Sequence, residues 1–492
     1  MGIIQQQTIK GSFYSYLGIA IGFITFIYLQ PKALLSEQVG LIGLLSSFSQ
    51  LFAQFAILGF NGTARYFPFF RNGKENNHGY LGLACLISFI GFLLFILLSI
   101  FLKDDIINQD AQKSSLFEEY YWYLIPLTLF TLFFNVFDLY ARMLYDTTSG
   151  RILREFTKRI FILLAILLVF FNAIPFELFM PLWLLANIIP TIQLALRLYS
   201  KNQLNLKLDF HFINGELKQK LINISLFAIL TGSAPIIIDN IDKFMINDRF
   251  GLSITGVYTI AFYFGTIITL PARSLYSIAY TIIAESWKSK DLDNIISIYK
   301  KSCINQLIAS LFIFLGIWAN IDTIMGILPD EYSSGRYVIF FIGLAHVIDS
   351  AAGVNGVILA TSKYFKYDSL FHLGLIGVTI AANLIFIPRF GITGAAIATA
   401  ITYLIFNTFR YVFILMAFNM QPFSYKTPVI ILVGLVAYLC ASSLPDFSNY
   451  LLNIIMRSSA ITIVFGLSIY FFNLSEDINS TIKGFLIKRL KS

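Results

Sequence analysis

Residues 79–102 read GYLGLACLISFIGFLLFILLSIFL, and no charged side chain interrupts them before Lys103. A helix rises about 1.5 Å per residue, so roughly 20 apolar residues cross the hydrocarbon core of a bilayer. This stretch is long enough to span a membrane as one helix. It predicts that lipid is the main solvent of the chain.

Apolar stretches of similar length follow one another through the 492-residue sequence. Charged residues make up 13% of the chain, whereas an ordinary soluble domain contains roughly 25%. The sequence therefore predicts an all-α polytopic membrane protein with about 14 transmembrane helices. We expect the spans near residues 11–31, 39–60, 79–102, 120–144, 152–172, 175–199, 217–243, 252–278, 302–326, 335–360, 368–387, 391–418, 427–444 and 451–473.

The distribution of basic residues predicts the topology. An even number of spans places both termini on one side, and cytoplasmic loops are enriched in Lys and Arg. With a cytoplasmic N-terminus, most of the 35 Lys and Arg residues fall in cytoplasmic segments. The predicted outer loops hold Lys32, Lys103, Lys113, Lys243, Arg249, Arg336 and Arg389. We therefore expect a multi-pass protein with both termini in the cytoplasm.

Composition also argues against several kinds of partner. The net charge is +8, but the basic residues lie in loops between apolar spans, which indicates topology rather than nucleic-acid binding. Cys85, Cys303 and Cys440 are far apart and lie in or beside apolar segments. Their spacing indicates neither a metal site nor a disulfide framework, so we expect no metal and no cofactor. The first span is predicted to be a retained helix and not a cleaved signal peptide.

The last segment, residues 480–492, has an amphipathic pattern. Ile482, Phe485, Leu486 and Leu490 share one helical face, and basic residues surround it. This pattern predicts a short helix on the surface of the inner leaflet, with a disordered basic tail as the alternative.

Two short segments indicate an internal repeat. Residues 35–43, LSEQVGLIG, open the second predicted span, and residues 252–258, LSITGVY, open the eighth in the same way. Pro175 and Pro388 precede the sixth and twelfth spans. We expect pseudo-symmetric six-helix lobes at 1–205 and 206–420, followed by two further helices and a basic tail at 421–492. Such halves enclose a cavity and can rock between two states of access.

His346 and Asp349 are the best-placed ionisable residues inside a predicted span. The nearest charges along the chain are Arg336 and Lys363, so Asp349 lies about midway through span 335–360. Their i, i+3 spacing puts both side chains on one helical face. Intramembrane ionisable residues commonly mark a substrate or ion path. We expect a polar pair that binds a coupling ion, a proton or substrate hydroxyls, or else a structural pair bonded to a neighbouring helix.

Three arginines, Arg273, Arg410 and Arg457, also fall within apolar stretches. Arg273 follows Pro271, which is expected to bend the eighth span. Its guanidinium could bind a phosphate through two hydrogen bonds, or reach to the membrane interface. Arg410, in the twelfth span, either lines a path or extends to the interface in the same way.

Two further groups of charges have helical spacing. Asp239, Asp242 and Lys243 cluster at the predicted outer end of the seventh span, where they form a polar site or a solvated helix end. Asp138 and Arg142 are four residues apart near the inner end of the fourth span. This spacing is more typical of an intrahelical ion pair than of a transport site.

Three motifs resemble those of one transporter family. They are residues 387–399, IPRFGITGAAIAT; residues 242–246, DKFMI, followed by Gly256-Val257-Tyr258 and Ala261; and residues 35–40, LSEQVG. Together they resemble the polysaccharide-biosynthesis (O-antigen) flippases of the multidrug/oligosaccharidyl-lipid/polysaccharide exporter superfamily, whose fold is MATE-like.

The resemblance implies a function and a set of partners. It implies two six-helix lobes in a V, which move undecaprenyl-pyrophosphate-linked oligosaccharide from the inner to the outer leaflet of the bacterial inner membrane. The partners it implies are the bilayer, this lipid-linked oligosaccharide, and the polysaccharide polymerase and glycosyltransferases of the same process. Family members use cationic cavity residues for the pyrophosphate, for which Arg273 and Arg410 are the candidates.

Two other functions remain open. A cation-coupled multidrug antiporter of the same fold would use an acidic cavity residue, for which Asp349 is available, although the first span carries no acidic residue. A membrane polysaccharide polymerase or glycosyltransferase would need a sizeable loop or a clustered acidic or metal-binding motif, and the sequence indicates neither. We therefore expect a transporter and not an enzyme.

Overall fold

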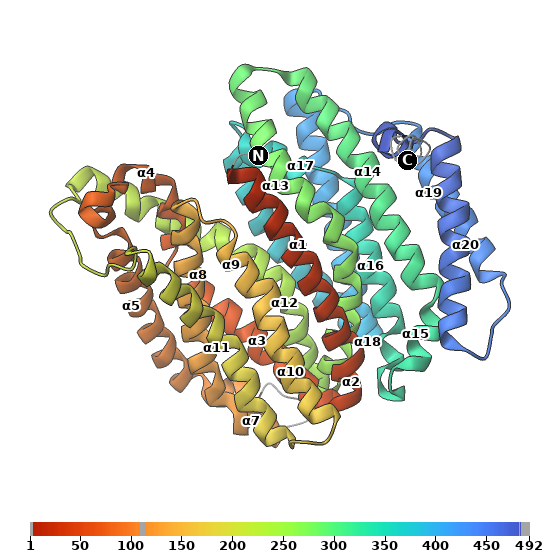
Figure 1. The fold of residues 1–492 in the computed structure, drawn as a ribbon, viewed down its shortest axis with the longest axis horizontal. Coiled ribbons are helices and arrows are strands. Elements are labelled where there is room, and N and C mark those ends of the chain that lie inside the picture. The colour runs from red at the N-terminus through yellow and green to blue at the C-terminus, as the bar shows by residue number, and fades with distance from the viewer. Residues whose placement is uncertain (1–2, 109–113, 482, 484–492) are drawn as a thin grey trace. The chain divides into compact units, whose positions relative to one another are not determined.

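The computed structural model describes residues 3–108, 114–481 and 483, and 86% of it is helix with no strands in this described part (Figure 1). The predicted all-α fold is confirmed. Most of the amphipathic segment expected at 480–492 lies outside the described residues. The three cysteines form no disulfide, and Cys303 is buried while Cys440 is exposed.

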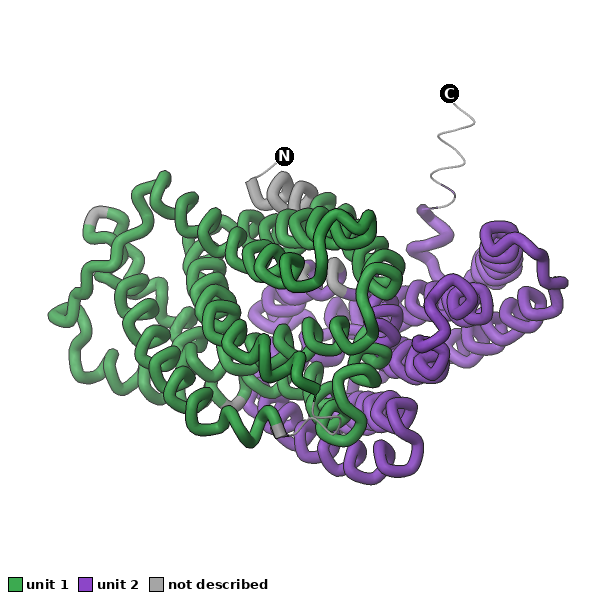
Figure 2. The backbone as a smooth tube through the Cα atoms, turned by 90° about the horizontal axis from the view of Figure 1, so that it is seen from below, with its two compact units in different colours: residues 1–259 green, residues 260–492 purple. Residues whose placement is uncertain are grey.

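The chain divides into two compact units, residues 1–259 and 260–492, which Figure 2 distinguishes by colour. The predicted lobe boundaries at 205 and 420 stay a prediction. The helices that begin in unit 1 are α1 Ile3–Phe23, α2 Gln30–Ala33, α3 Ser36–Ala56, α4 Phe67–Phe70, α5 Tyr80–Phe101, α6 Lys103–Asn108, α7 Ser115–Tyr120, α8 Leu124–Met143, α9 Ser149–Ile152, α10 Lys158–Phe170, α11 Phe176–Ser200 and α12 Gly215–Thr266.

The described part of unit 2 contains eight further α-helices. They are α13 Leu270–Ser289, α14 Leu292–Ala319, α15 Ile321–Ile327, α16 Arg336–Ala351, α17 Asn355–Thr361, α18 Phe365–Phe418, α19 Lys426–Ser442 and α20 Tyr450–Phe471. One hydrophobic core of this unit joins α14 to α19 and α20, and a second joins α13 and α14 to α17 and α18. These cores hold the helices that position the polar residues described below.

Nine helices in the described part of the chain are long and apolar enough to cross a membrane, or ten if the bent pair at 330–361 counts as one span. The two longest, α12 and α18, each contain a sharp break, at Gly251 (φ 79°) and at Gly391 (φ 59°). Glycine adopts positive φ without the steric cost that a side chain imposes. Both breaks coincide with predicted boundaries between spans, so each helix is long enough for two crossings. The total of fourteen stays a prediction.

The two repeated motifs meet each other within unit 1. Gly40 of α3 and Gly256 of α12 are so close to the opposite helix that neither site has room for a side chain. A Cβ on Gly40 would lie 2.0 Å from the carbonyl oxygen of Leu252, and a Cβ on Gly256 would lie 1.9 Å from that of Ser36. The hydroxyls of Ser36 and Ser253 are hydrogen-bonded at 2.7 Å. Small residues permit such backbone-to-backbone approach in membrane helices.

This contact predicts a large effect for a small substitution. We expect Gly40→Ala to lower the thermal unfolding midpoint of the purified protein in detergent, because the added methyl group must separate α3 from α12. The expected loss is about 1–3 kcal/mol, as for other overpacked sites. Gly466→Ala in α20 is the matched control, since nothing lies within 4 Å of its Cβ position. Equal midpoints for the two variants would contradict the close contact.

A loop carboxylate joins the turn after α8 to the end of α11. Asp146 accepts hydrogen bonds from the backbone N–H and hydroxyl of Ser149, at 3.1 and 2.6 Å, and from Lys201 Nζ at 2.9 Å. Arg197 Nε lies 3.3 Å from the same carboxylate. Burial raises the pKa of Asp146, but the hydrogen bonds from Ser149 and Lys201 and the Arg197 charge outweigh burial and hold this pKa well below its usual range.

The lowered pKa gives a pH-dependent prediction. Because the folded-state pKa lies below the unfolded value, the charged carboxylate stabilises the fold above about pH 4 and loses this effect as the pH falls through the folded-state pKa. We expect Asp146→Asn to cost roughly 1 kcal/mol at pH 7. The difference between the unfolding midpoints of variant and wild type should be constant from pH 7 to about pH 4 and should begin to shrink as the pH falls further. A difference that grows as the pH falls would contradict a lowered folded-state pKa for Asp146.

Candidate functional site: a buried polar network in unit 2

The predicted site residue Asp349 lies near the end of α16, just before a bend between two helices. Helix α16 ends at Ala351 and α17 begins at Asn355, and the two are bent by 53°. Gly353 adopts a φ of +60° at this bend, and a Cβ there would lie 2.6 Å from Cys303 Sγ. The bend brings Asp349 and Asn355 to the same neighbouring helix, α18.

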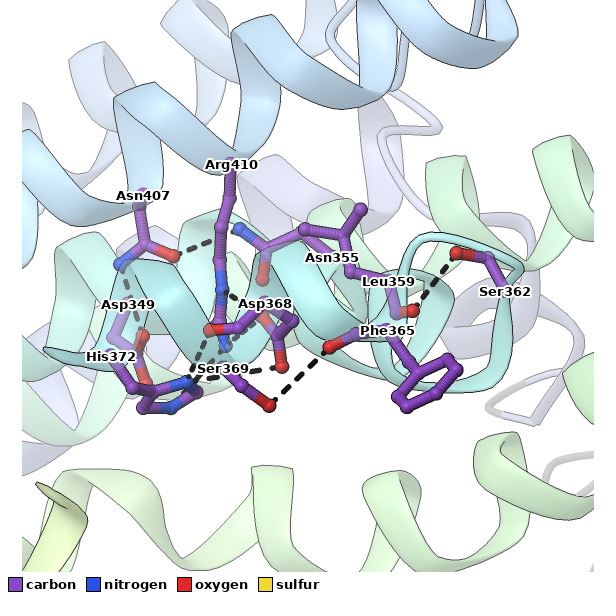
Figure 3. A network of polar contacts seen from close by, with 10 residues as sticks. All are labelled: Asp349, Asn355, Leu359, Ser362, Phe365, Asp368, Ser369, His372, Asn407 and Arg410. Atoms are coloured by element: carbon purple, nitrogen blue, oxygen red, sulfur yellow. Dashed lines mark hydrogen bonds and ion pairs between the residues drawn. The ribbon is translucent and has the colours of Figure 1, made fainter. Parts of the chain in front are cut away.

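Two asparagines connect Asp349 to α17 and α18 (Figure 3). Asn407 of α18 donates from Nδ2 to Asp349 Oδ1 at 3.0 Å, and its own Oδ1 accepts from Asn355 Nδ2 at 2.9 Å. Asn407 Nδ2 also donates to the Tyr403 carbonyl at 3.0 Å. Both amide side chains are buried. The carboxylate is therefore held by a relay of uncharged donors, which can rearrange without moving a second charge.

One helical turn further along α18, Arg410 forms a buried ion pair. Its Nε and Nη2 donate to Oδ1 of Asp368 at 3.0 and 2.6 Å (Figure 3). Each residue is 8% exposed. The guanidinium lies 4.0 Å from the centre of the Phe406 ring. Gly356 of α17 leaves room for it, because a Cβ there would be 2.9 Å from Nη1.

The pair links the two halves of α18. Asp368 precedes the break at Gly391 and Arg410 follows it. His372, one turn after Asp368, completes the cluster: its Nδ1 lies 2.9 Å from the Asp368 carbonyl oxygen, and its Nε2 lies 3.5 Å from Arg410 Nη2. Opposite charges in a low-dielectric setting attract far more strongly than in water. The ion pair therefore fixes how the halves of α18 pack.

His346 lies on α16 next to this network but makes aromatic contacts. Its ring packs edge-on against Tyr403 at 5.8 Å and against Phe262 at 6.5 Å between ring centres. His346 is buried, whereas Asp349 on the same helix is partly exposed. A role of either residue in transport stays a prediction.

The remaining predicted residues lie elsewhere. Asp138 is paired with Arg142 at 3.3 Å, as the spacing indicated, and also with Arg154 at 3.6 Å. Arg273 belongs to α13, and its side chain lies outside the described part of the structure. Arg410 does not reach for the membrane interface, since Asp368 holds it in the interior of unit 2.

The cluster predicted at the end of the seventh span belongs to unit 1. Asp242 is only 3% exposed and accepts a hydrogen bond from Tyr258 at 2.6 Å, so it is not part of a solvated helix end. Lys243 Nζ donates to the hydroxyl of Ser47 at 3.3 Å and interacts electrostatically with Asp239 and Asp242. These residues link α12 to α3 within the unit.

Four network residues were missed by the sequence reasoning: Asn355, Asp368, His372 and Asn407. Asp368 and His372 lie at the beginning of the predicted span 368–387, where charge is ordinary. Their i, i+4 spacing, and the i, i+3 spacing of Asn407 and Arg410, were the available signals. Neither spacing indicates which helices the residues would join.

The fold resembles that of known transporters. Lipid II flippase MurJ, in an inward closed conformation, shares 14% identity at a TM-score of 0.73, and the likeness covers 94% of this chain and 99% of that chain. An inward-facing MATE-family multidrug resistance transporter of the MOP superfamily shares 13% identity at a TM-score of 0.59, covering 82% and 94%. A MATE transporter from Vibrio cholerae shares 11% identity at a TM-score of 0.53, covering 85% and 96%.

No family model matches the sequence, and the search of curated proteins found no match. The structural likeness nevertheless defines the class of fold. The chain is a multi-pass membrane protein with the fold seen in MurJ and in the MATE-family transporters. The fold expected from the sequence motifs is therefore confirmed.

The buried ion pair gives a stability prediction. Either Arg410→Gln or Asp368→Asn leaves one charge buried without its partner, and such a loss typically costs about 3–5 kcal/mol. We expect both variants to show a strongly lowered unfolding midpoint in detergent, and the double variant to lose less than the two single losses combined. The matched control is Arg336→Gln, because the Arg336–Asp322 pair, at 2.7 Å, is exposed. A loss of similar size in the control would refute the special role of burial.

Proposed function

We propose that the protein is a flippase that moves a lipid-linked oligosaccharide across the bacterial inner membrane by alternating access. The observation that carries the proposal is the likeness to the lipid II flippase MurJ, which extends over 94% of this chain and 99% of that one. The likeness to MATE transporters is weaker and covers less of this chain. The physical task suits such a fold, because a polar head cannot cross hydrocarbon without groups that satisfy its hydrogen bonds.

The substrate class follows from the sequence motifs and from the chemistry of the network. Amides and hydroxyls within spans can bind sugar hydroxyls, and an arginine can bind a phosphate through two hydrogen bonds. In the described conformation, two nitrogens of Arg410 are directed at Asp368. A pyrophosphate would have to compete with this carboxylate for Arg410.

A second candidate function is cation-coupled multidrug export. The observation that favours it is the carboxylate of Asp349, which is only partly exposed and is bonded to a neutral amide. A carboxylate in that setting can take up a proton or a cation, as a coupled antiporter requires. The same group would serve an ion-coupled flippase, so Asp349 alone does not separate the two functions.

Deletion of the gene distinguishes the flippase from the multidrug exporter. For a flippase, we expect the deletion strain to lose surface polysaccharide and to accumulate the lipid-linked intermediate on the inner leaflet, with unchanged growth in toxic cations. For a multidrug exporter, the polysaccharide would stay normal and the sensitivity to cationic drugs would rise. Normal surface polysaccharide without accumulated intermediate would refute the flippase proposal.

Complementation of that strain tests Asp349. We expect Asp349→Ala to restore transport at roughly a tenth of the wild-type rate or less, which corresponds to about 1.4 kcal/mol or more. The reason is that Asn407 and Asn355 lose the charged group that orders them. The matched control is Asp322→Ala, which removes an exposed carboxylate of the same unit. Full transport by Asp349→Ala, at equal membrane abundance, would remove the residue from the site.

A further inference from the structure

A cavity of about 250 Å³ opens in unit 2, away from the polar network described above. Three segments form it: the first half of α14, the link between α18 and α19 with the first residue of α19, and the residues that follow α20. Its polar lining includes Lys300, Lys301, Asn305, Lys426 and Asp477. The cavity therefore gathers three ammonium groups from segments far apart in the sequence.

The cavity lies at the ends of three predicted spans, and therefore at a predicted edge of the membrane. Lys300 and Lys301 directly precede the predicted span 302–326, Lys426 precedes span 427–444, and Leu474 follows span 451–473. All three span ends belong to the side that the basic residues predict as cytoplasmic. Exposed aromatic side chains flank the same segments, with Tyr425 and Phe471 each 74% exposed. Aromatic residues are enriched where a membrane protein meets the headgroup region.

The charges in the cavity are not balanced by its carboxylates. Asp477 accepts a hydrogen bond from Asn305 Nδ2 at 2.7 Å and lies 3.9 Å from Lys301 Nζ. Glu476 is the second acid in the lining and is exposed. Lys426 Nζ donates to the Asn473 carbonyl at 3.2 Å, which positions it without neutralising it. Among the described residues, Lys300 has neither an ion-pair nor a hydrogen-bond partner.

We propose that this cavity binds a phosphate group, carried by an anionic phospholipid of the cytoplasmic leaflet or by a soluble phosphate compound. Lys300 and Lys426 supply ammonium groups with unused N–H donors, and phosphate oxygens accept charge-assisted hydrogen bonds from such donors. Basic pockets between helix ends on the cytoplasmic side bind anionic headgroups in other membrane proteins. The site is separate from Asp349 and Arg410, so it does not depend on the transported substrate.

Thermal unfolding of the full-length protein tests this site. The protein is purified in a neutral detergent and melted alone, with dioleoylphosphatidylglycerol, with dioleoylphosphatidylcholine, or with sodium phosphate. We expect phosphatidylglycerol to raise the midpoint more than phosphatidylcholine does. In Lys300→Gln/Lys426→Gln, this extra rise should fall by at least half. An equal rise with sodium phosphate, lost in the same variant, would support the phosphate site and identify its occupant as a soluble compound.

Two controls keep the result specific. Lys288→Gln/Lys290→Gln removes two cations on the same predicted side that do not line the cavity, and it should keep the full lipid response. Lys300→Gln alone removes an exposed side chain that makes no ion pair or hydrogen bond with the described residues, so it should fold normally and weaken the response on its own. An undiminished response in both Lys300 variants, or equal responses to the two lipids with none to phosphate, would overturn the proposal.

Discussion

The ion pair between Arg410 and Asp368 is the interaction on which the arrangement of unit 2 depends. A charge placed among apolar helices is tolerated only when an opposite charge and hydrogen bonds compensate its lost hydration. Here the two charges belong to opposite halves of α18, on either side of the break at Gly391. Their attraction holds the halves together at a distance from the break. Helices α16 and α17 then join the same face of α18 through Asp349, Asn355 and Asn407.

The two carboxylates of the network have different partners. Arg410 and Asp368 neutralise each other, and Phe406 covers the guanidinium. Asp349, in contrast, is bonded to an uncharged amide, and Arg410 acts on it electrostatically from α18. A carboxylate in that position can gain or lose a proton or an ion without breaking the ion pair. This difference is why we propose a role in transport for Asp349 and a role in the stability of the unit for the ion pair.

The glycine contact in unit 1 has a different physical basis. Gly40 and Gly256 attract nothing by themselves, but the absence of side chains lets the backbones of α3 and α12 touch. The contact then gains dispersion energy along both helices and a hydrogen bond between Ser36 and Ser253. The two motifs that the sequence indicated as a repeat are thus the two sides of one contact. At this contact, α3 and α12 are held together by packing and a hydrogen bond, without an ion pair between the two described motifs.

Much of the fold was accessible from the sequence. Hydropathy alone indicated an all-helical membrane protein. A single apolar segment of about 20 residues in lipid can satisfy its own backbone polar groups only by forming a helix. The breaks at Gly251 and Gly391 fall at predicted boundaries between spans. Asp349 and Arg410 were recognised because a charge inside an apolar stretch is costly wherever its partner lies.

The partners of these charges were decided by the tertiary structure. Asp368 lies 42 positions from Arg410 and Asn407 lies 58 from Asp349. The periodicity of a helix defines which of its faces is polar, but it does not define the helix that this face meets. Gly40 and Gly256 each looked like an ordinary small residue until packing placed one against the other. The sequence by itself determined the environment and the helices, and only the packing of those helices decided which polar groups satisfy one another.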